Sequence, residues 1–237
     1  MVKLKYQIQR VCWHIKQIMP GEMRYREIHY SQSGEDVCID RLLKFKNEGF
    51  YIDVGCYHPF QYSNTCLFYK KGWSGINIDA KKETIDLFNK YRKRDINLNL
   101  GVGAESGELE YFMFKQGAKN TFSAERAKGM IEEKPNEYIG KRIVDIRPLA
   151  EILNNYINES QMIDFMDIDV EGLDLEVLKS NDWNKFRPHY VLVETDGIKT
   201  VTEVLLEEIV MYMMQCNYSI IGKFGNTLLM KDDLFKE

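Results

Sequence analysis

Short apolar runs alternate with amphipathic segments along most of the chain after about residue 30. The runs FYIDV (50–54), GINIDA (75–80), MIDFMDIDV (162–170) and HYVLVET (189–195) have the length and apolar character of buried strands. Residues 82–94 place apolar side chains near one side among charges, as expected of a helix that crosses a sheet. Strands that alternate with helices are typical of a parallel sheet covered on both faces, so the sequence predicts a doubly wound α/β fold.

Weaker patterns complete the predicted fold. Further helices are expected at 63–71, 148–156, 173–181 and 199–215, and further strands at 96–103, at 107–114 and, as a pair around residues 224–226, within 218–231. Ser63 is the expected N-cap of the first of these helices, and Gly72 ends it. The pair of strands at the end is expected to be antiparallel. Residues 115–142 have weak periodicity and many charges, so we expect a lid or substrate loop there.

The first 20 residues differ from the rest of the chain. They carry basic residues and no acid, and their apolar residues recur at helical spacing. We therefore expect an N-terminal helical extension (1–30) ahead of one large domain (31–237). The extension is expected to pack on its own domain or on a second subunit of a homodimer. Contact with a membrane surface through residues 1–20 is the less favoured alternative.

Composition excludes some classes of protein. The formal net charge of −4 argues against a general nucleic-acid binder, because such proteins neutralise phosphates with a basic surface. The five cysteines are scattered and form neither a CxxC pair nor a cluster with zinc-ligand spacing. This pattern favours a reducing compartment, so we expect a cytoplasmic protein.

Acidic residues gather where the predicted strands end, which is where open α/β sheets bind ligands. They are Asp53, Asp79, Asp167, Asp169, Glu171, Glu194 and Asp196. Asp79 follows Asp53 at about the offset at which an acid meets ribose hydroxyls, and a carboxylate can accept from both of them. After Gly55 the loop lacks the further glycines that pyrophosphate binding requires. A cofactor with a ribose and no phosphate, such as S-adenosylmethionine, fits this pattern; an ordinary tight turn at Gly55 beside an ordinary strand-end acid is the alternative.

Several sequence blocks resemble one known family. The blocks are SQSGED (31–36), YIDVGCYHP (51–59), SNTCLFYKKGWSGINIDA (63–80), FMDIDVEGLDLEVLKSNDW (165–183) and VLVET (191–195). In this order they resemble the FkbM family of S-adenosylmethionine-dependent O-methyltransferases, over roughly residues 31–222. The resemblance implies a class I methyltransferase (Rossmann-like) sheet, mostly parallel with an antiparallel last strand. It also implies methyl transfer to a hydroxyl of a sugar, a glycan precursor or a related natural-product scaffold.

The expected cofactor-binding residues combine this resemblance with position in the predicted sheet. They are Gln32, Glu35, Asp53, Gly55, Cys56, Tyr57, Asp79, Gly101 and Asp169. The resemblance places Asp79 at the ribose position, although the family more usually has Glu there. Gln32 and Glu35, with Asp36, match the block before the first strand, which is expected to fold back over the cofactor. A helix cap with surface acids is the alternative interpretation of that block.

Methyl transfer to a hydroxyl needs a base, because an alcohol is a poor nucleophile until its proton is being removed. The candidate catalytic residues are His58, Asp169, Glu171 and Glu194. His58 precedes a proline and could equally be a structural turn residue. Asp169 and Glu171 could instead cap the helix that starts near Leu173. A divalent metal could join these acids with Asp196, but no metal site is assigned.

Two other functions remain open at this point. Asp167 and Asp169 could form the DxD motif of a metal-dependent glycosyltransferase, which would leave the loop at Gly55 and the SNT block unexplained. A non-catalytic interaction protein that keeps the methyltransferase fold is the third hypothesis. The preference for a carbohydrate acceptor rests on the resemblance and on four aromatic residues that could equally be core, namely Tyr111, Phe112, Phe122 and Tyr138.

Overall fold

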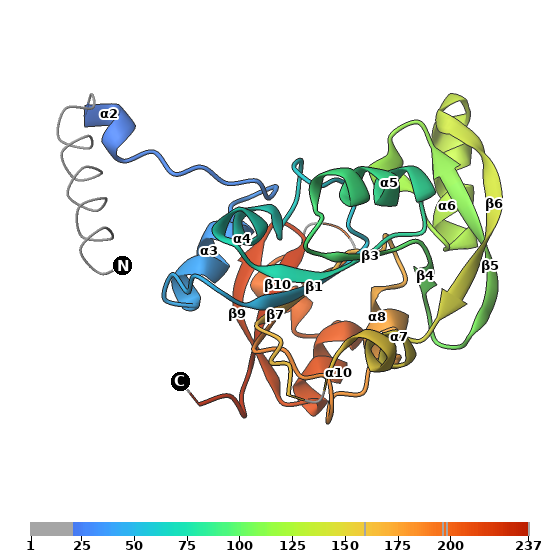
Figure 1. Ribbon diagram of the computed structural model, residues 1–237. Helices are drawn as coiled ribbons and strands as arrows, with labels where there is room; N and C mark the ends of the chain where they lie inside the picture. Colours follow the sequence, from blue (N-terminus) through green and yellow to red (C-terminus); the bar gives the residue numbers. More distant parts are fainter. Residues whose placement is uncertain (1–20, 159, 196, 198, 237) are drawn as a thin grey trace.

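The computed structural model describes residues 21–236 except 159, 196 and 198. The predicted basic helix at 1–20 and the acid Asp196 therefore lie outside the described residues. The described chain starts with the short helix α2 (Gly21–Arg24) and an exposed segment that leads to the main body (Figure 1). None of the helices in the described ranges combines the length and apolar character that a bilayer crossing requires.

A seven-stranded sheet forms the centre of the molecule, with the order β3-β2-β1-β7-β8-β10-β9. Its strands are β1 (Phe50–Val54), β2 (Ser74–Ile78), β3 (Ile96–Leu98), β7 (Phe165–Ile168), β8 (Tyr190–Glu194), β9 (Tyr218–Phe224) and β10 (Thr227–Asp232). The first five pair in parallel, whereas β10 runs antiparallel to both β8 and β9. The expected doubly wound sheet with an antiparallel last strand is thus confirmed.

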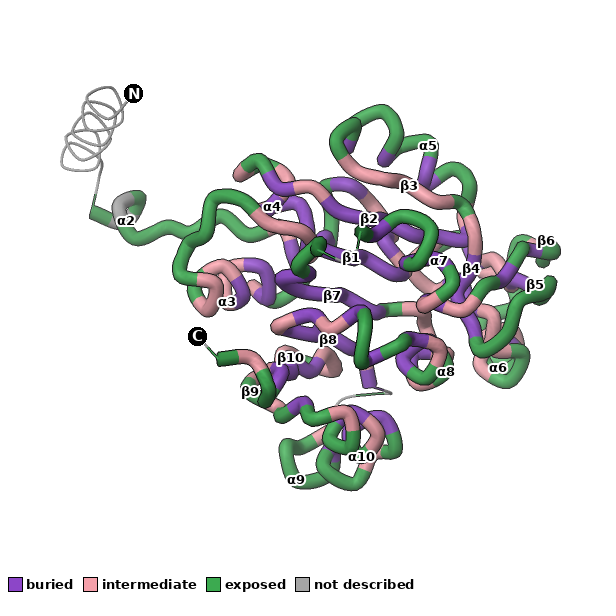
Figure 2. The backbone as a smooth tube through the Cα atoms, turned by 60° about the horizontal axis from the view of Figure 1, so that its bottom comes forward, coloured by how far each residue is buried: buried purple, intermediate pink, exposed green. Residues whose placement is uncertain are grey.

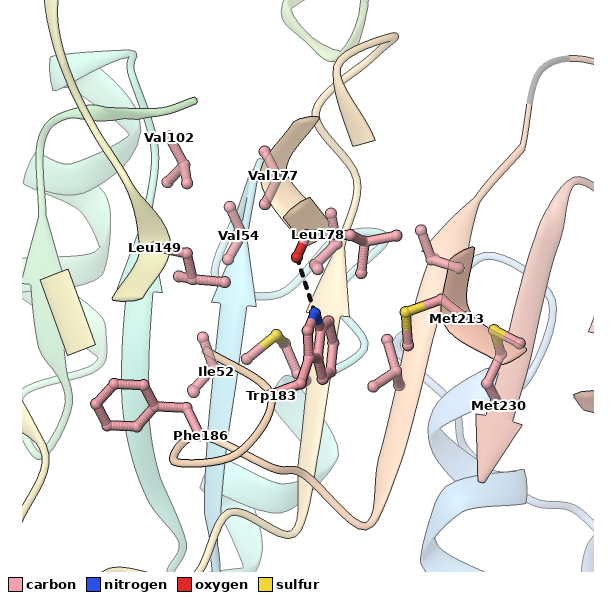
Figure 3. Packing of buried hydrophobic residues seen from close by; sticks show 14 of the residues in the cluster. Ile52, Val54, Val102, Leu149, Val177, Leu178, Trp183, Phe186, Met213 and Met230 are labelled. Carbon is pink, nitrogen blue, oxygen red and sulfur yellow. Dashed lines mark hydrogen bonds between the residues drawn. The ribbon is translucent and has the colours of Figure 1, made fainter. Parts of the chain in front are cut away.

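Helices cover both faces of this sheet (Figure 1). One face carries α3 (Glu35–Leu42), α4 (Cys66–Lys71) and α5 (Lys82–Tyr91), and the other carries α7 (Leu149–Tyr156), α8 (Asp174–Lys179) and α10 (Glu208–Gln215). Figure 2 shows β1, β7 and β8 as the buried centre of the molecule. On the side of α7, α8 and α10, Trp183 lies in the core and its indole donates to the Leu178 carbonyl oxygen at 2.9 Å (Figure 3). The indole polar group is thereby satisfied within an apolar cluster.

Side chains along each strand point alternately to the two faces of the sheet, and this decides which acids lie together at the strand ends. Ile52 pairs with Met166 in the register of β1 and β7, and both side chains belong to the core beneath α7 and α8. Asp53 pairs with Asp167 one residue further on, so these two acids share the opposite face. Two neighbouring parallel strands therefore present carboxylates side by side at their carboxyl ends.

A second, smaller sheet stands beside the main one (Figure 1). It consists of β4 (Gly101–Val102), β5 (Gly107–Phe114) and β6 (Tyr138–Arg147), and the connection from β5 to β6 carries a 3-10 turn (Gly117–Lys119), α6 (Ala124–Glu133) and a second 3-10 turn (Pro135–Glu137). We name the segment from β5 to β6 (107–147) the insertion.

Three predicted elements differ in the structure. The strand expected at 96–103 is split, because Gly101–Val102 leaves the main sheet to pair with β6. The lid or loop expected at 115–142 contains α6 and the start of β6, which is stabilised by long-range pairing with β5 that local periodicity does not reveal. The helix expected at 199–215 forms two pieces, α9 (Val201–Val204) and α10, and Thr200 caps the first of them.

Arg92 is a buried cation that joins the site loop to the main sheet. Its side chain is fully buried. The Nε–H donates to the Pro59 carbonyl oxygen at 3.1 Å, and Nη1 donates to the Tyr51 hydroxyl at 3.1 Å. Nη2 donates to the hydroxyls of Ser63 at 3.1 Å and Thr65 at 3.2 Å. One buried guanidinium group therefore fixes the loop between β1 and α4 by hydrogen bonds.

The charge of this guanidinium is compensated nearby. The closest Asp95 carboxylate oxygen lies 3.8 Å from Arg92 Nη1 and accepts a hydrogen bond from Tyr51 at 2.7 Å. A buried cation is tolerated only when it is paired and hydrogen-bonded in this way. Removing one member of such a network leaves the others without partners in a dry environment.

We therefore expect Arg92→Met to lower the free energy of unfolding by about 3–5 kcal/mol. Urea unfolding followed by circular dichroism measures this loss. The matched control is Lys93→Met, which removes the same charge from the neighbouring exposed position and should stay within about 0.5 kcal/mol of wild type. Equal effects of the two substitutions would contradict the structural role of Arg92.

Candidate functional site

One large pocket opens at the carboxyl ends of the parallel strands. It has about 1130 Å³ of space, including its opening to solvent. Its walls come from the ends of β1, β2, β7 and β8, the segment 32–35 at the start of α3, and the insertion. This is the edge of an open α/β sheet at which ligands bind.

Gly55 forms the floor of the pocket at the point where the backbones of two strands come together. Its φ of 90° lies in the left-handed region, and a Cβ atom there would lie 1.8 Å from the carbonyl oxygen of Asp169. The Gly55 N–H donates to the Ile78 carbonyl oxygen at 2.9 Å, and the Asp169 N–H donates to the Val54 carbonyl oxygen at 3.0 Å. Only glycine fits here, because any Cβ atom would collide with the backbone of Asp169 and its residue would have to adopt a left-handed conformation.

Asp53 and Asp167 form a buried acidic pair next to this turn. Thr65 donates to Asp53 at 2.8 Å and Asn64 donates to Asp167 at 2.8 Å. Burial raises the pKa of Asp53 to about 6, and burial together with repulsion from Asp53 raises the pKa of Asp167 well above its usual range. A positively charged group bound nearby would stabilise both carboxylates.

Asp79 ends β2 on another side of the pocket. One of its oxygens accepts from the Lys81 N–H at 2.6 Å, and burial raises its pKa to about 7. The adjacent wall is apolar, where the rings of Tyr111 and Phe122 pack with centroids 4.7 Å apart. An acid beside a flat apolar wall suits a nucleoside, since the base needs apolar surface and the ribose needs an acceptor.

Every residue that the sequence singled out as cofactor-binding lines this one pocket. They are Gln32, Glu35, Asp53, Gly55, Cys56, Tyr57, Asp79, Gly101 and Asp169. Glu35 also accepts from the Ser33 N–H at 2.7 Å. Glu35 and Asp36 are buried at the start of α3, so they are not the surface acids of the alternative interpretation. Asp36 lies outside the pocket lining and accepts from Ser31 Oγ at 2.6 Å. The individual contacts to a cofactor stay predictions.

The hydrogen bonds of His58 favour the structural turn over the catalytic base. Its Nδ1 accepts from the N–H groups of Phe60 at 3.2 Å and Gln61 at 3.1 Å. Neutral His58 therefore carries its proton on Nε2, where it can donate but not accept. Burial also lowers the pKa of His58. The imidazole lines the pocket and can orient a ligand there as a hydrogen-bond donor.

Asp169, Glu171 and Glu194 form a second acidic cluster at the ends of β7 and β8. One carboxylate oxygen from each lies within 4.8 Å of the others. Asp169 faces the open pocket, yet protein surrounds it closely enough that desolvation, together with repulsion from Glu194 and Glu171, raises its pKa well above the usual range. Burial raises the pKa of Glu171 to about 7, against the opposing effect of Arg126. These acids could accept a proton or provide hard oxygen ligands for a divalent metal.

Asp169 and Glu171 do not cap the helix near Leu173, which was the alternative interpretation of these acids. Asp174, the first residue of α8, accepts from the N–H groups of Val170 at 3.2 Å and Gly172 at 3.1 Å. The carboxylates of Asp169 and Glu171 are therefore left to face the pocket. The glycosyltransferase hypothesis also gains no support, because Asp167 bonds to Asn64 and lies outside the acidic cluster that contains Asp169.

Two residues of the insertion hold Glu171 and were missed by the sequence reasoning. Thr121 donates to the Glu171 carbonyl oxygen at 2.7 Å, and Arg126 forms an ion pair with the Glu171 carboxylate. Glu171 has a φ of 57°, a left-handed conformation that is uncommon for a non-glycine residue. Nothing in the sequence signalled these contacts, because they join positions about 50 residues apart. Of the four aromatic residues suspected of meeting a substrate, Tyr111 and Phe122 line the pocket.

One family model matches most of the chain. Residues 53–220 match the family model described as Methyltransferase FkbM domain. A search among curated proteins finds none that matches this chain.

Two solved structures are similar to this chain. The methyltransferase FkbM from Methylobacillus flagellatus KT is 14% identical to this chain, with a TM-score of 0.47. The match covers 85% of this chain and 48% of that protein, so this chain spans about half the length of that protein. A protein from Sulfolobus solfataricus, described as a type 11 methyltransferase, is 10% identical with a TM-score of 0.42, and the match covers 87% of this chain and 96% of that one.

We expect Gly55→Ala to destabilise the fold. The left-handed conformation alone costs a non-glycine residue about 1–3 kcal/mol, and the new methyl group would displace the Asp169 carbonyl. Urea unfolding measures the loss of stability. Gly107→Ala is the matched control, because a Cβ atom there meets nothing within 4 Å. A Gly55→Ala protein as stable as this control would refute the close approach.

The buried acids also predict a pH dependence of stability. Asp53 and Asp79 have pKa values of about 6 and about 7 in the folded protein, above the value of about 3.9 in unfolded chains. Between the unfolded and folded pKa values the folded state binds more protons, so the stability from these groups is lost progressively as pH rises from about 4 to about 7. We expect these groups to lower the Tm of the ligand-free protein between about pH 4.5 and about pH 7.

Asp79→Asn should make this fall smaller, because the amide does not ionise. Asp86→Asn, at an exposed position on α5, should leave the fall as in wild type. A pH dependence that is the same in all three proteins would show that Asp79 is not the buried titrating group.

Proposed function

Because the chain belongs to the FkbM methyltransferase family, we propose that it is an S-adenosylmethionine-dependent O-methyltransferase. The observation that supports this most strongly is the pocket beside Gly55, which lies at the carboxyl ends of the strands and is lined by acids on two sides. Asp79 and its apolar neighbours suit the nucleoside, and the pair Asp53 and Asp167 suits a cationic amino acid group. The residues present therefore fit this cofactor.

When bound, S-adenosylmethionine supplies a methyl group on a positively charged sulfur, which a hydroxyl oxygen can take in one displacement that releases S-adenosylhomocysteine and a proton. The work of the protein is then to hold both reactants in line and to accept that proton. The pocket supplies rigid backbone at Gly55 for the first task and carboxylates at the ends of β7 and β8 for the second.

We assign proton removal to the cluster of Asp169, Glu171 and Glu194. Glu171 is the best matched member, because a base works most effectively when its pKa lies near the working pH and burial raises the pKa of Glu171 to about 7. Arg126 and Thr121 fix the direction of its side chain and backbone. Glu194 is held by Asn226 and can orient the acceptor hydroxyl.

The proposed acceptor is a hydroxyl of a sugar, a glycan precursor or a related natural-product scaffold, as the family resemblance suggests. We further propose that the enzyme works in the cytoplasm. The cysteines within the described residues carry free thiols, in keeping with a reducing compartment. A homodimer, and a role for residues 1–20 in packing or membrane contact, stay predictions.

Isothermal titration with S-adenosylhomocysteine tests the cofactor assignment, with UDP-glucose and Mn²⁺ titrated in parallel. We expect S-adenosylhomocysteine to bind wild type and Asp79→Ala to bind it at least about tenfold more weakly, which is about 1.4 kcal/mol. The loss follows from removing an acceptor of the ribose hydroxyls.

Asp86→Ala is the matched control and should bind like wild type, because Asp86 is exposed and pairs with Lys82 on the surface of α5. Binding of UDP-glucose alone would overturn the methyltransferase assignment in favour of glycosyl transfer. Binding of neither ligand would favour the non-catalytic interaction protein.

A further inference from the structure

Two buried carboxyl groups lie side by side in the pocket without a cation in their row of the sheet. Asp53 of β1 and Asp167 of β7 are register partners on adjacent parallel strands, and both are buried. Neighbouring strands lie about 4.8 Å apart, so the two carboxyl groups are close neighbours on one face. The same row continues to Asn77 of β2 and Leu192 of β8, and neither of these side chains carries a charge.

The side chains that donate hydrogen bonds to this pair are also uncharged. Thr65 donates to Asp53 and Asn64 donates to Asp167, each at 2.8 Å. The charge of Arg92 favours the ionised form of Asp53, but the donors of Arg92 bind other groups, among them Thr65 itself. Neither acid of the pair therefore has a directly bonded cation among these contacts.

The other ionisable groups around the pair are five acids and one thiol. They are Glu35 of α3, Glu194 of β8, Asp79, Asp95, Asp169 and Cys56. Among the residues that the structure describes, the pocket lining includes no lysine or arginine. Two ionised carboxylates this close repel each other strongly where water is excluded, and they are more stable when one proton lies between them.

Asn64 adds a polar atom that lacks a partner. Its Nδ2 donates to Asp167, whereas its Oδ1 is buried and accepts no hydrogen bond from any residue that the structure describes. A buried acceptor without a donor is unfavourable. Asn64 lines the pocket together with both acids. An ammonium group offers three donors and one positive charge, so it would satisfy all three side chains.

We propose that Asp53 and Asp167 share one proton in the ligand-free protein, and that the α-ammonium group of the cofactor displaces this proton and donates to both carboxylates and to Asn64 Oδ1. The proposal rests on the proposed function and adds Asp167 and Asn64 to the residues expected to bind the cofactor. The ammonium group keeps its own protons, the shared proton passes to solvent, and no other bond changes. Binding therefore becomes tighter as pH rises, because the proton is then easier to displace.

The test compares two ligands that differ in their amino acid part. S-adenosylhomocysteine carries the ammonium group, whereas 5′-methylthioadenosine has the same nucleoside and sulfur without it. Isothermal titration of the full-length protein in MES, phosphate and bis-Tris buffers gives the number of protons released, because these buffers differ in ionisation enthalpy. A proton released by Asp79 on binding the ribose is common to both ligands and cancels in the comparison.

At about pH 6 we expect S-adenosylhomocysteine to release about one proton more than 5′-methylthioadenosine. Its affinity should rise about tenfold between about pH 5.5 and about pH 7.5, and it should rise more than that of 5′-methylthioadenosine. Both comparisons use wild type alone, so they test the shared proton even if a variant fails to fold.

Variants test the individual residues. Asp167→Asn should abolish the extra proton release and weaken S-adenosylhomocysteine about tenfold at about pH 7.5, because a charged acceptor is lost. Asn64→Ala should weaken it at least about threefold. Both variants should bind 5′-methylthioadenosine within about twofold of wild type. Asp86→Asn, at an exposed position on α5, is the matched control and should leave both ligands unchanged.

The outcomes separate this proposal from the cofactor assignment. Failure of wild type to bind S-adenosylhomocysteine would overturn the proposed function. Binding with equal proton release for the two ligands would overturn only the shared proton, as would an Asp167→Asn protein that still releases the extra proton. An Asn64→Ala protein with unchanged affinity for S-adenosylhomocysteine would remove Asn64 from the ammonium site.

Discussion

The burial of one guanidinium group holds the functional end of this molecule together. Arg92 lies at the end of α5, far along the chain from the loop that it supports. Its donors bind Pro59, Ser63 and Thr65, and Thr65 in turn donates to Asp53. A single cation thus fixes the loop that follows Gly55 and limits the freedom of an acid in the pocket. Its removal would leave the groups of this loop and Tyr51 of β1 without their buried partner.

The second constraint is the crowding of acidic side chains at the strand ends, where their negative charges repel one another. Strand register places Asp53 beside Asp167, and the ends of β7 and β8 add Asp169 and Glu194. Each of these carboxylates would be more stable in water, and the pKa values of the first three are raised accordingly. A cationic ligand would relieve this repulsion on binding, so the arrangement that destabilises the ligand-free protein would favour a bound cation such as the sulfonium of the proposed cofactor. Repulsion between the carboxylates is thus both a cost to stability and the proposed source of affinity for a cation.

Local patterns were sufficient to predict the main sheet, and strand position together with the family resemblance predicted residues that line one pocket. Buried strands such as FYIDV are recognisable from composition, and parallel topology brings their carboxyl ends to one edge. Within the insertion, β5 was predicted at 107–114, but β6 was not, because it is stabilised by long-range pairing with β5. The structural role of Arg92 was not predicted either, because a basic residue at a charged helix end looks exposed in sequence.

A crystal structure of the protein with S-adenosylhomocysteine tests the central claim most directly. The account predicts the nucleoside beside Asp79 and the apolar wall of Tyr111 and Phe122, with the amino acid part above Gly55. A nucleoside bound anywhere else would contradict it.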